Sequence, residues 1–306
     1  MSYDVIGDIH GCSKTLEKLL SKLGYNRDSD EIYRHPDRTV VFLGDFIDRG
    51  PHQREVISIV KPMIEAGSAR SVMGNHEYNA IAYATPDEER GGFLRAHSDR
   101  NRKQHVAFLD EYAFDSREHK EVIAWFTTLP LWLDLGDIRV IHACWAREII
   151  RNLGSPVLTR ELLHASCEKG AREYEAIETL LKGKEIALPE GHVMHDKDGN
   201  ARHYMRVRWW DQSASSYSMA FLGPESGRTH IPDDEIAGDH LIEYSHEEPP
   251  VFLGHYWMEG EPEPLAPNIA CTDYSVAKPG GKLVAYRWDG ERDLNRERFV
   301  AVDRVD

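Results

Sequence analysis

The chain has 306 residues, of which 41% are hydrophobic and 29% are charged. This composition is typical of a globular protein and excludes a disordered chain, and no apolar run approaches the roughly 18 residues that span a bilayer, so no membrane association is expected. The net charge of −15 argues against a long nucleic acid as ligand, because such polymers are attracted by a basic surface. Small phosphate compounds remain compatible with this charge, since a few arginines or metal ions can create a local positive pocket.

The four cysteines are scattered and show no paired spacing. They predict neither a disulfide framework nor a thiolate zinc site. The first residues lack a basic segment followed by an apolar one, so no signal peptide is expected. We therefore predict a protein of the reducing cytoplasm, and the oligomeric state stays open.

Short runs rich in Val, Ile, Leu and aromatic residues predict strands along the chain. They lie at residues 3–7, 39–44, 70–73, 138–141, 251–253 and 283–287. A helix is predicted from Ser13, a suitable N-cap, to a stop at Gly24, and further helices are predicted over residues 54–66 and 118–128. The alternation of strands and helices predicts a layered α/β fold.

The segment from about residue 145 to residue 250 has a different pattern. It opens with predicted helices at 159–169 and 171–182 and then becomes largely loop-like, apart from a predicted strand at 204–210. Long irregular segments in compact proteins are usually functional or disordered. We expect one domain over residues 1–306, with a cap insertion at about 145–250.

Two further segments, residues 196–200 and the stretch after Arg292, carry predictions of their own. Residues 196–200 echo a calcium-binding loop, but the glycine comes too early and no acidic residue is correctly spaced, so a β-turn is predicted there. The charged residues that follow Arg292 are expected to be peripheral.

Reactive side chains follow the first two predicted strands. Asp8 and His10 end the first strand, and residues i and i+2 of a strand point to the same side, so both side chains can reach one cation. Asp45, Asp48 and Arg49 follow the second strand, between two glycines that permit tight turns.

The same arrangement recurs three more times. Asn75 and His76 follow the third predicted strand, His142 follows the fourth, and His255 follows the fifth. Any one of these residues alone is equally explained by a polar turn or a hydrogen-bonded histidine. Their common position at strand ends, where α/β folds place ligand sites, indicates a single functional site.

The ordered motifs resemble those of the calcineurin-like metallophosphoesterase superfamily. They are DIHG at residues 8–11, GDFIDRG at 44–50, GNHE at 74–77, a later His and a later Gly-His. The Asp48–Arg49 pair and the sequence GHYW at 254–257 are similar to the branch of serine/threonine protein phosphatases and symmetrical diadenosine tetraphosphatases. Residues 253–288 particularly resemble the tetraphosphatases, although 273–275 read DYS where those enzymes usually show DTG. The resemblance covers the chain outside the cap and implies a β-sandwich core flanked by helices.

The resemblance implies a centre for two divalent metal ions. Asp8, His10 and Asp45 would hold the first ion, and Asp45 would bridge to a second ion held by Asn75, His142 and His255. Oxygen and imidazole ligands without a thiolate favour Mn²⁺, with Fe or Zn²⁺ as alternatives. Two such ions lower the pKa of a water and stabilise the oxygen that attacks phosphorus.

Other residues are assigned to the substrate. His76, held by Asp48, is the candidate general acid for the leaving oxygen, and Arg49 is a candidate phosphate ligand because its planar fork matches phosphate oxygens. A second arginine is expected from the cap, where Arg206 and Arg208 lie on one side of the predicted strand and Arg206 is favoured.

These features predict a hydrolase of phosphate esters or anhydrides. The first expected substrate is a phosphomonoester, either on a phosphoprotein or in a small phosphate. The alternative is a dinucleoside polyphosphate, which the C-terminal resemblance suggests. A third possibility is an inactive metal-binding scaffold. It is disfavoured because the sequence contains all the expected metal ligands, the candidate general acid and Arg49.

Overall fold

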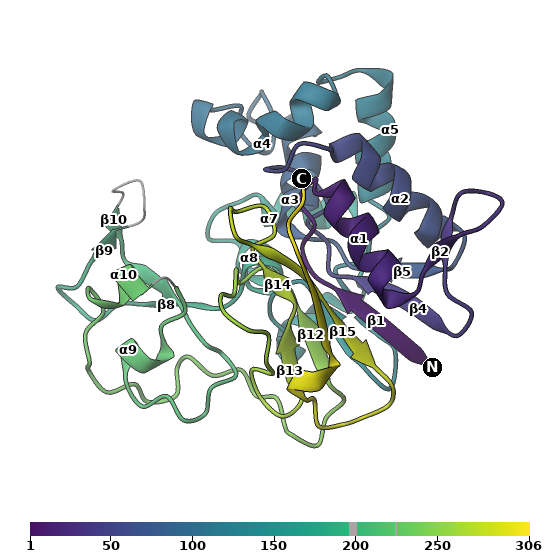
Figure 1. Ribbon diagram of the computed structural model, residues 1–306. Helices are drawn as coiled ribbons and strands as arrows, with labels where there is room; N and C mark the ends of the chain where they lie inside the picture. Colours follow the sequence, from purple (N-terminus) through teal and green to yellow (C-terminus); the bar gives the residue numbers. More distant parts are fainter. Residues whose placement is uncertain (196–200, 224) are drawn as a thin grey trace.

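The computed structural model describes residues 1–195, 201–223 and 225–306, so the turn predicted at 196–200 lies outside the described residues. Two β-sheets form the centre of the chain (Figure 1). The first sheet has the order β14-β15-β1-β4-β5, with β16 also paired to β15, and the second has the order β13-β12-β7-β6. The first contains β1 (Ser2–Ile6), β4 (Arg38–Phe42), β5 (Ala69–Ser71), β14 (Asp273–Tyr274), β15 (Lys282–Trp288) and β16 (Phe299–Asp303). The second contains β6 (Trp132–Asp134), β7 (Arg139–Ile141), β12 (Val251–Leu253) and β13 (Ile269–Cys271).

The direction of the strands explains where the polar loops meet. In the first sheet β4 pairs in parallel with both β1 and β5, and in the second sheet β12 pairs in parallel with both β7 and β13. Parallel strands end at the same edge of a sheet. The loops that follow β1, β4 and β5 therefore lie next to one another, as do those that follow β7 and β12.

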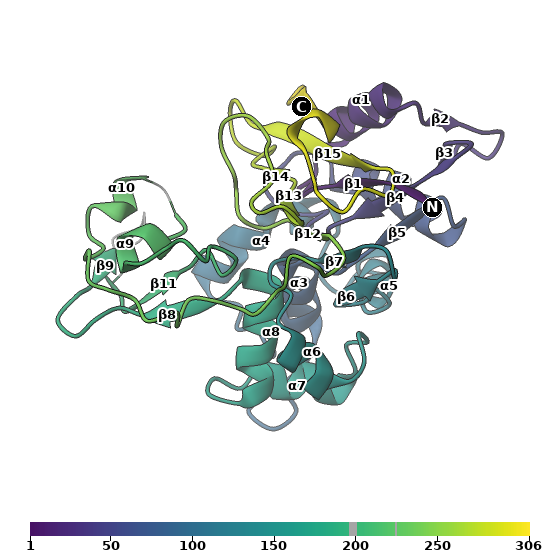
Figure 2. The same cartoon turned by 90° about the horizontal axis from the view of Figure 1, so that it is seen from below.

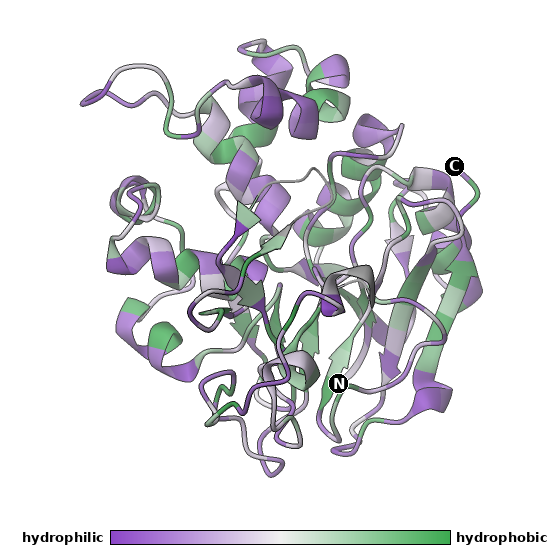
Figure 3. Ribbon diagram, turned by 90° about the vertical axis from the view of Figure 1, so that its left-hand side faces the viewer, coloured by the Kyte–Doolittle hydropathy of each residue, from purple (hydrophilic) through white to green (hydrophobic). Residues whose placement is uncertain are grey.

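The two sheets pack face to face, and side chains alternate between the two faces of each strand. Tyr3 and Val5 of β1 point into the space between the sheets, where they join Phe252 and other buried residues. Ile6 and Phe42 point to the opposite face and pack in a larger apolar cluster with the leucines of the first helix. Figure 3 shows the strands as largely hydrophobic, with the more hydrophilic segments mostly around them.

Helices cover the outside of the sandwich, which confirms the predicted layered α/β architecture (Figures 1 and 2). They are α1 (Ser13–Leu23), α2 (Gln53–Glu65), α3 (Asn75–Ala84), α4 (Asp99–Glu111), α5 (Arg117–Phe126), α6 (Arg147–Leu153), α7 (Arg160–Ser166) and α8 (Arg172–Lys182). A short hairpin of β2 (Asn26–Arg27) and β3 (Tyr33–Arg34) follows α1, and a 3₁₀ turn, η1 (Arg296–Arg298), precedes β16. Among the described residues, no helix has the length and apolarity needed to cross a membrane.

The ends of α1 combine local and distant contacts. Gly24 ends the helix in a left-handed conformation (φ 91°), as predicted. At the other end, Cys12 rather than Ser13 occupies the N-cap position and supplies no side-chain cap. The carboxylate of Asp306 takes that role, because it accepts hydrogen bonds from the backbone N–H groups of Lys14 and Thr15, both at 2.9 Å.

The expectation that the chain is peripheral after Arg292 is therefore wrong. β16 pairs along five residues of β15 in the first sheet, and Asp306 caps α1. Although the stretch is rich in charged residues, it contains the largely apolar strand β16, whose Val302 is buried against α1 and β15.

Much of the segment expected to form a cap projects from the sandwich (Figures 1 and 2). The projecting part contains β8 (Glu185–Ala187), β9 (Met194–His195), β10 (Ala201–Arg202), β11 (Tyr204–Arg206), α9 (Tyr217–Ala220) and α10 (Glu225–Arg228). It has an apolar cluster of its own, which includes Met205, Val207 and Phe221. By contrast, α7 and α8 pack through Leu163 and Leu180 onto the main cluster. The strand predicted at 204–210 is shorter than expected and ends at Arg206.

Candidate metal centre

Hydrogen bonds between backbones join the loops at the strand ends. The N–H groups of Ile9 and His10 both donate to the carbonyl oxygen of Asp45, at 3.1 and 2.9 Å, and the N–H of Gly254 donates to the carbonyl of His142 at 2.8 Å. The loop after β1 is thus fixed to the loop after β4, and the loop after β12 to that after β7. The side chains that these loops carry converge on one buried place.

The backbone of this region is strained at residues that were predicted as functional. His10, Asp45, Asp48, Arg49 and His255 all have positive φ angles, between 46° and 69°. Non-glycine residues seldom adopt this left-handed region, and such strain concentrates at functional sites. The loops are held in conformations that aim side chains into the site at a cost in local stability.

Two glycines of the motifs are required by close packing against site carboxylates. A Cβ atom on Gly74 would lie 2.2 Å from Oδ1 of Asp45, and a Cβ atom on Gly254 would lie 2.3 Å from Oδ1 of Asp8. Both distances are far inside van der Waals contact. Only glycine therefore lets the neighbouring strand end come this close to the carboxylates.

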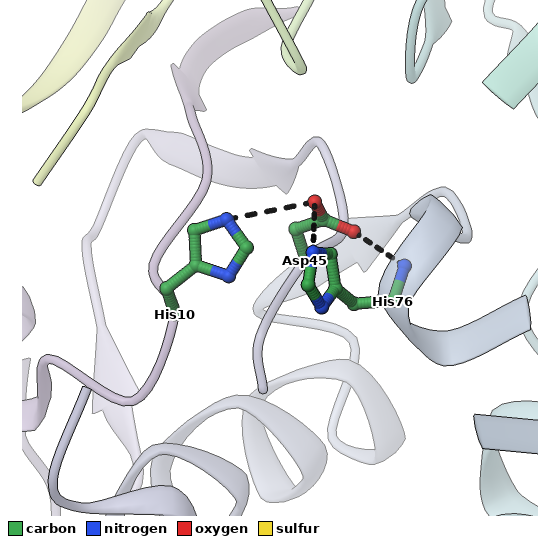
Figure 4. Close-up of side chains that lie close together, drawn as sticks. All are labelled: His10, Asp45 and His76. Carbon is green, nitrogen blue, oxygen red and sulfur yellow. Dashed lines mark hydrogen bonds and ion pairs between the residues drawn. The ribbon is translucent and has the colours of Figure 1, made fainter. Parts of the chain in front are cut away.

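The first group of potential ligands is drawn in Figure 4 and consists of His10, Asp45 and His76. Oδ2 of Asp45 lies 3.6 Å from Nε2 of His10 and 3.9 Å from Nε2 of His76. The backbone N–H of His76 donates to Oδ1 of Asp45 at 2.8 Å. Asp8 completes this side, with Oδ2 3.9 Å from Nε2 of His10.

The second group shares Asp45 with the first and adds His142 and His255. Nε2 of His142 lies 3.5 Å from Oδ2 of Asp45. Asn75 lies between the two histidines, with Oδ1 2.7 Å from Nδ1 of His255 and 3.1 Å from Nε2 of His142. All six residues predicted as metal ligands are thus brought together, and Asp45 lies where the two groups meet.

The donor set fits two divalent cations. Among the described residues, Nε2 of His10 and Nε2 of His255 are buried ring nitrogens without a hydrogen-bond partner, an arrangement that costs free energy unless a ligand completes it. The opposite ring nitrogens of His10 and His142 donate to the carbonyl oxygens of Ile47 and Leu43, at 2.8 and 2.6 Å. Such bonds orient metal-binding imidazoles and fix which nitrogen is free to bind.

Burial and mutual charge shape the titration of these groups. Burial disfavours the charged form of His142, but the carboxylates of Asp45 and Asp8 outweigh it and raise the pKa of His142 to about 10. Burial would likewise raise the pKa of Asp45, yet His142 and His76 hold it well below its usual range. The pKa of His10 is lowered well below its ordinary value by burial and then by Arg49. Burial and neighbouring charges thus move the pKa values of these site residues away from their ordinary ranges.

Beside the ligand groups, Asp48 lies between two histidines. Its Oδ2 is 2.6 Å from Nδ1 of His76, as the general-acid assignment requires, and its Oδ1 is 2.9 Å from Nδ1 of His105. Burial opposes ionisation of Asp48, but His105 and then His76 hold its pKa below the usual range. Nη2 of Arg49 lies 3.4 Å from Nε2 of His76, so the arginine faces the nitrogen that would carry the transferred proton.

His105 was missed by the sequence analysis. It lies on α4, whose other residues are mostly polar, and is itself buried. A lone histidine on a helix does not reveal which residue it contacts, so the sequence held no usable signal for this bond.

A second missed residue is Glu77, which fixes the motif loops. Its carboxylate accepts hydrogen bonds from the backbone N–H groups of Asp45, Phe46 and Gly74, at 2.8, 2.8 and 3.0 Å. Burial and the negative charge of Asp45 raise the pKa of Glu77 to about 7. The signal was present, because glutamate at the third position of a helix commonly accepts from the backbone at its start.

Asp273 supports the neighbouring loop. It is buried and accepts from the backbone N–H groups of Trp257 and Ser275, at 2.8 and 2.9 Å. After burial itself, Asp273 is the next cause that raises the pKa of Asp8 well above its ordinary value.

Of the two candidate arginines, Arg206 is the one whose charge acts on a predicted ligand. Burial and then the charge of Arg206 lower the pKa of His255 well below its ordinary value. Nε of Arg206 is buried and has no hydrogen-bond partner in the part of the chain that the structure describes. Arg208 follows the end of β11, and its backbone N–H donates to Ala220. The sequence had predicted that both residues lie on one strand, but only Arg206 belongs to β11.

The profile of the calcineurin-like phosphoesterase family matches residues 1–204. The chain belongs to the calcineurin-like phosphoesterase family. The resemblance drawn from the motifs is thereby confirmed, and so is the fold class that a calcineurin-like phosphoesterase implies.

Curated relatives are similar to parts of this chain, and a solved structure shares its fold. The asymmetrical bis(5'-nucleosyl)-tetraphosphatase PrpE of Halalkalibacterium halodurans is 48% identical over 77 residues, which is 25% of this chain and 31% of that protein. PrpE of Bacillus subtilis is 33% identical over 149 residues, 47% of this chain and 57% of that protein. The chain thus spans between about a third and little more than half of these relatives. A serine/threonine phosphatase from Saccharomyces cerevisiae matches all of this chain and 81% of its own, with a TM-score of 0.51 and 17% identity, and supports the fold alone.

Proposed function

We propose that this chain is a metal-dependent hydrolase of phosphate esters or anhydrides that acts in the cytoplasm. One observation carries the proposal: Oδ2 of Asp45 lies 3.5–3.9 Å from imidazole nitrogens of His142, His10 and His76, in the middle of a buried donor set. A carboxylate so placed can bridge two cations. The candidate acid and a phosphate-binding arginine stand directly beside it.

Asp8, His10 and Asp45 would hold one divalent ion, and Asp45, Asn75, His142 and His255 the other. Mn²⁺ is the first choice, since the donors are oxygens and imidazoles without a thiolate. When bound, two such ions polarise the phosphate and make a water nucleophilic at neutral pH. Nε2 of His76 lies 3.9 Å from Oδ2 of Asp45, so His76 could also serve as a ligand of the first ion. Its role as acid rather than ligand is part of the proposal.

Side chains of the protein bind the phosphate and protonate the leaving group. Arg49, and Arg206 from the projecting part, bind oxygens of the phosphate and offset its negative charge. Water attacks phosphorus in line, and the bond to the leaving oxygen breaks. His76 gives its Nε2 proton to that oxygen, while Asp48 holds the other ring nitrogen and stabilises the imidazolium before transfer.

The segment at about 145–250 is proposed to cap this site. Two observations support the proposal: the projecting part has its own apolar cluster, and Arg206, which belongs to it, acts electrostatically on His255. A cap with these properties would select the substrate by the group that it encloses.

For the substrate, a phosphomonoester of a protein or small molecule is the first reading. The alternative, a dinucleoside polyphosphate, is supported by the names of the curated relatives, which are called asymmetrical tetraphosphatases rather than the symmetrical ones suggested by the C-terminal motifs.

The test is a substrate panel with the manganese-loaded protein. p-Nitrophenyl phosphate, a phosphoserine peptide and diadenosine tetraphosphate are compared by kcat/KM, and Asp45→Asn serves as the inactive control. Turnover of at least one compound that is lost in the control supports the proposal. Absence of turnover with all three, while the protein binds metal, contradicts it.

A further inference from the structure

Trp257 follows the proposed ligand His255 by two residues, and its backbone is held firmly. The N–H of Trp257 donates to Oδ2 of Asp273 at 2.8 Å, and the N–H of Met258 donates to the carbonyl oxygen of Asp273 at 2.9 Å. Trp257 has a positive φ of 53°, a conformation that a non-glycine residue keeps only where its surroundings hold it. The residue is 37% exposed, so its indole lies at the protein surface rather than in the core.

The indole contacts the arginine that was assigned to the phosphate. Cζ of Arg49 lies 4.1 Å from the centroid of the Trp257 ring, where the negative face of the ring attracts the guanidinium. This contact uses the charge of the guanidinium rather than its hydrogen-bond donors, so the N–H groups stay available for phosphate oxygens. A carboxylate in the place of the indole would occupy those donors and compete with the phosphate.

The other neighbours of Arg49 do not explain how its side chain is held. Arg49 is exposed, and within the described ranges it forms no ion pair with a carboxylate. Its Nη2 lies 3.4 Å from Nε2 of His76, but a histidine that acts as a general acid is protonated, and two like charges repel each other. Asp273 attracts Arg49 electrostatically, yet its oxygens accept from the backbone of Trp257 and Ser275.

We propose that Trp257 is a positioning residue, whose indole holds the Arg49 guanidinium beside His76 with its N–H donors free for the phosphate. An exposed arginine loses side-chain entropy when a phosphate orders it, and a ring that restricts it beforehand reduces this loss. Trp257 acts through Arg49 and needs no contact with the substrate. The inference rests on the proposed function, in which Arg49 binds phosphate, and adds the residue that orients this arginine.

The test is a double-mutant cycle between Trp257 and Arg49. The wild type, Trp257→Leu, Arg49→Gln and the double variant, each at one fixed excess of Mn²⁺, are compared by kcat/KM for p-nitrophenyl phosphate and by calorimetric binding of orthophosphate. Trp257→Leu should lower kcat/KM and weaken orthophosphate binding about fivefold, as expected for the loss of one cation–π contact. In the Arg49→Gln background the same substitution should have no further effect, because no guanidinium is left to position.

Two further variants serve as controls. Trp257→Phe keeps an aromatic face for the guanidinium and should retain most of the orthophosphate binding that Trp257→Leu loses. Lys278→Gln removes the other cation over the same ring, whose Nζ lies 4.7 Å from the centroid, and should leave kcat/KM and orthophosphate binding unchanged. A loss with Lys278→Gln as large as that with Trp257→Leu would mean that the indole acts through the lysine, which would overturn the proposal.

Other results would also contradict the positioning role. Equal losses from Trp257→Leu with and without Arg49 would show that the indole acts independently of the guanidinium, and a loss of bound manganese would assign Trp257 to the support of His255. If the wild type binds orthophosphate but does not hydrolyse p-nitrophenyl phosphate, the proposed function fails separately, and the calorimetric cycle alone decides the role of Trp257. A wild type that does not bind orthophosphate would contradict both proposals.

Discussion

At the scale of single residues, Asp45 is the shared member of both ligand groups. Asp45→Asn removes the charge and leaves one good donor oxygen, so the side chain can no longer bridge two cations. We expect bound metal to fall to about one equivalent or less, with the fold preserved by circular dichroism. Elemental analysis of the purified variant measures this, and a variant with two equivalents and wild-type turnover would show that Asp45 is not the bridge.

Substitution of His76 tests whether this residue acts as a general acid or as a metal ligand. His76→Asn should retain the metal and lower the rate about 10²–10⁴-fold, as loss of a general acid does. The loss should be much larger with a phosphoserine peptide than with p-nitrophenyl phosphate, if both are substrates, because nitrophenolate leaves readily without a proton. His105→Gln, which weakens the support of Asp48, should give the same pattern more mildly.

Kinetics with both substrates and elemental analysis on the same preparations check this assignment. Equal losses with both substrates would indicate that His76 clamps phosphate or activates water. A loss of metal would make it a ligand of the first group.

At the scale of elements, the contact between Asp306 and α1 is a stabilising tie between distant parts of the sequence. Asp306→Ala leaves N–H groups of the first turn without a side-chain acceptor, which typically lowers the free energy of unfolding by about 1 kcal/mol. Urea unfolding measures the change. Asp303→Ala, on the exposed side of β16, is the control, and an equal loss in the control would refute the capping role.

β11 offers a test of the cap. Arg206→Gln should lower kcat/KM about 10–100-fold, since hydrogen bonds to charged groups contribute strongly. Arg208→Gln is the control, because it removes the same charge two residues further along the chain, and it should lower kcat/KM far less. Equal losses, or a larger loss for Arg208, would show that Arg206 does not serve the phosphate.

The elements also show what a sequence can predict. The five apolar runs that precede site residues are strands with nearly the predicted bounds, because alternation and β-branched residues act locally. β16 and the early end of β11 escaped prediction, because pairing with β15 and with β8 decides them. Pairing between residues far apart in sequence leaves no local pattern.

At the scale of the whole molecule, the parallel order of β1, β4 and β5 is what made the site predictable. Residues that follow adjacent parallel strands lie at the same edge of the sheet. Polar residues found at the ends of such strands are therefore expected to lie close together. His105 lies on a helix that reaches the site from elsewhere, and no periodicity encodes such an approach. The motifs therefore predicted which candidate donors the fold brings together, whereas the residues around them could be identified only from the fold.

The central claim is that catalysis depends on bound metal at this centre. The most direct measurement is hydrolysis of p-nitrophenyl phosphate by protein stripped with a chelator and then dialysed, before and after addition of Mn²⁺. The buried, unpartnered ring nitrogens of His10 and His255 predict that the stripped protein is inactive and that Mn²⁺ restores turnover as it binds. Full activity of protein shown by elemental analysis to be free of metal would contradict the account.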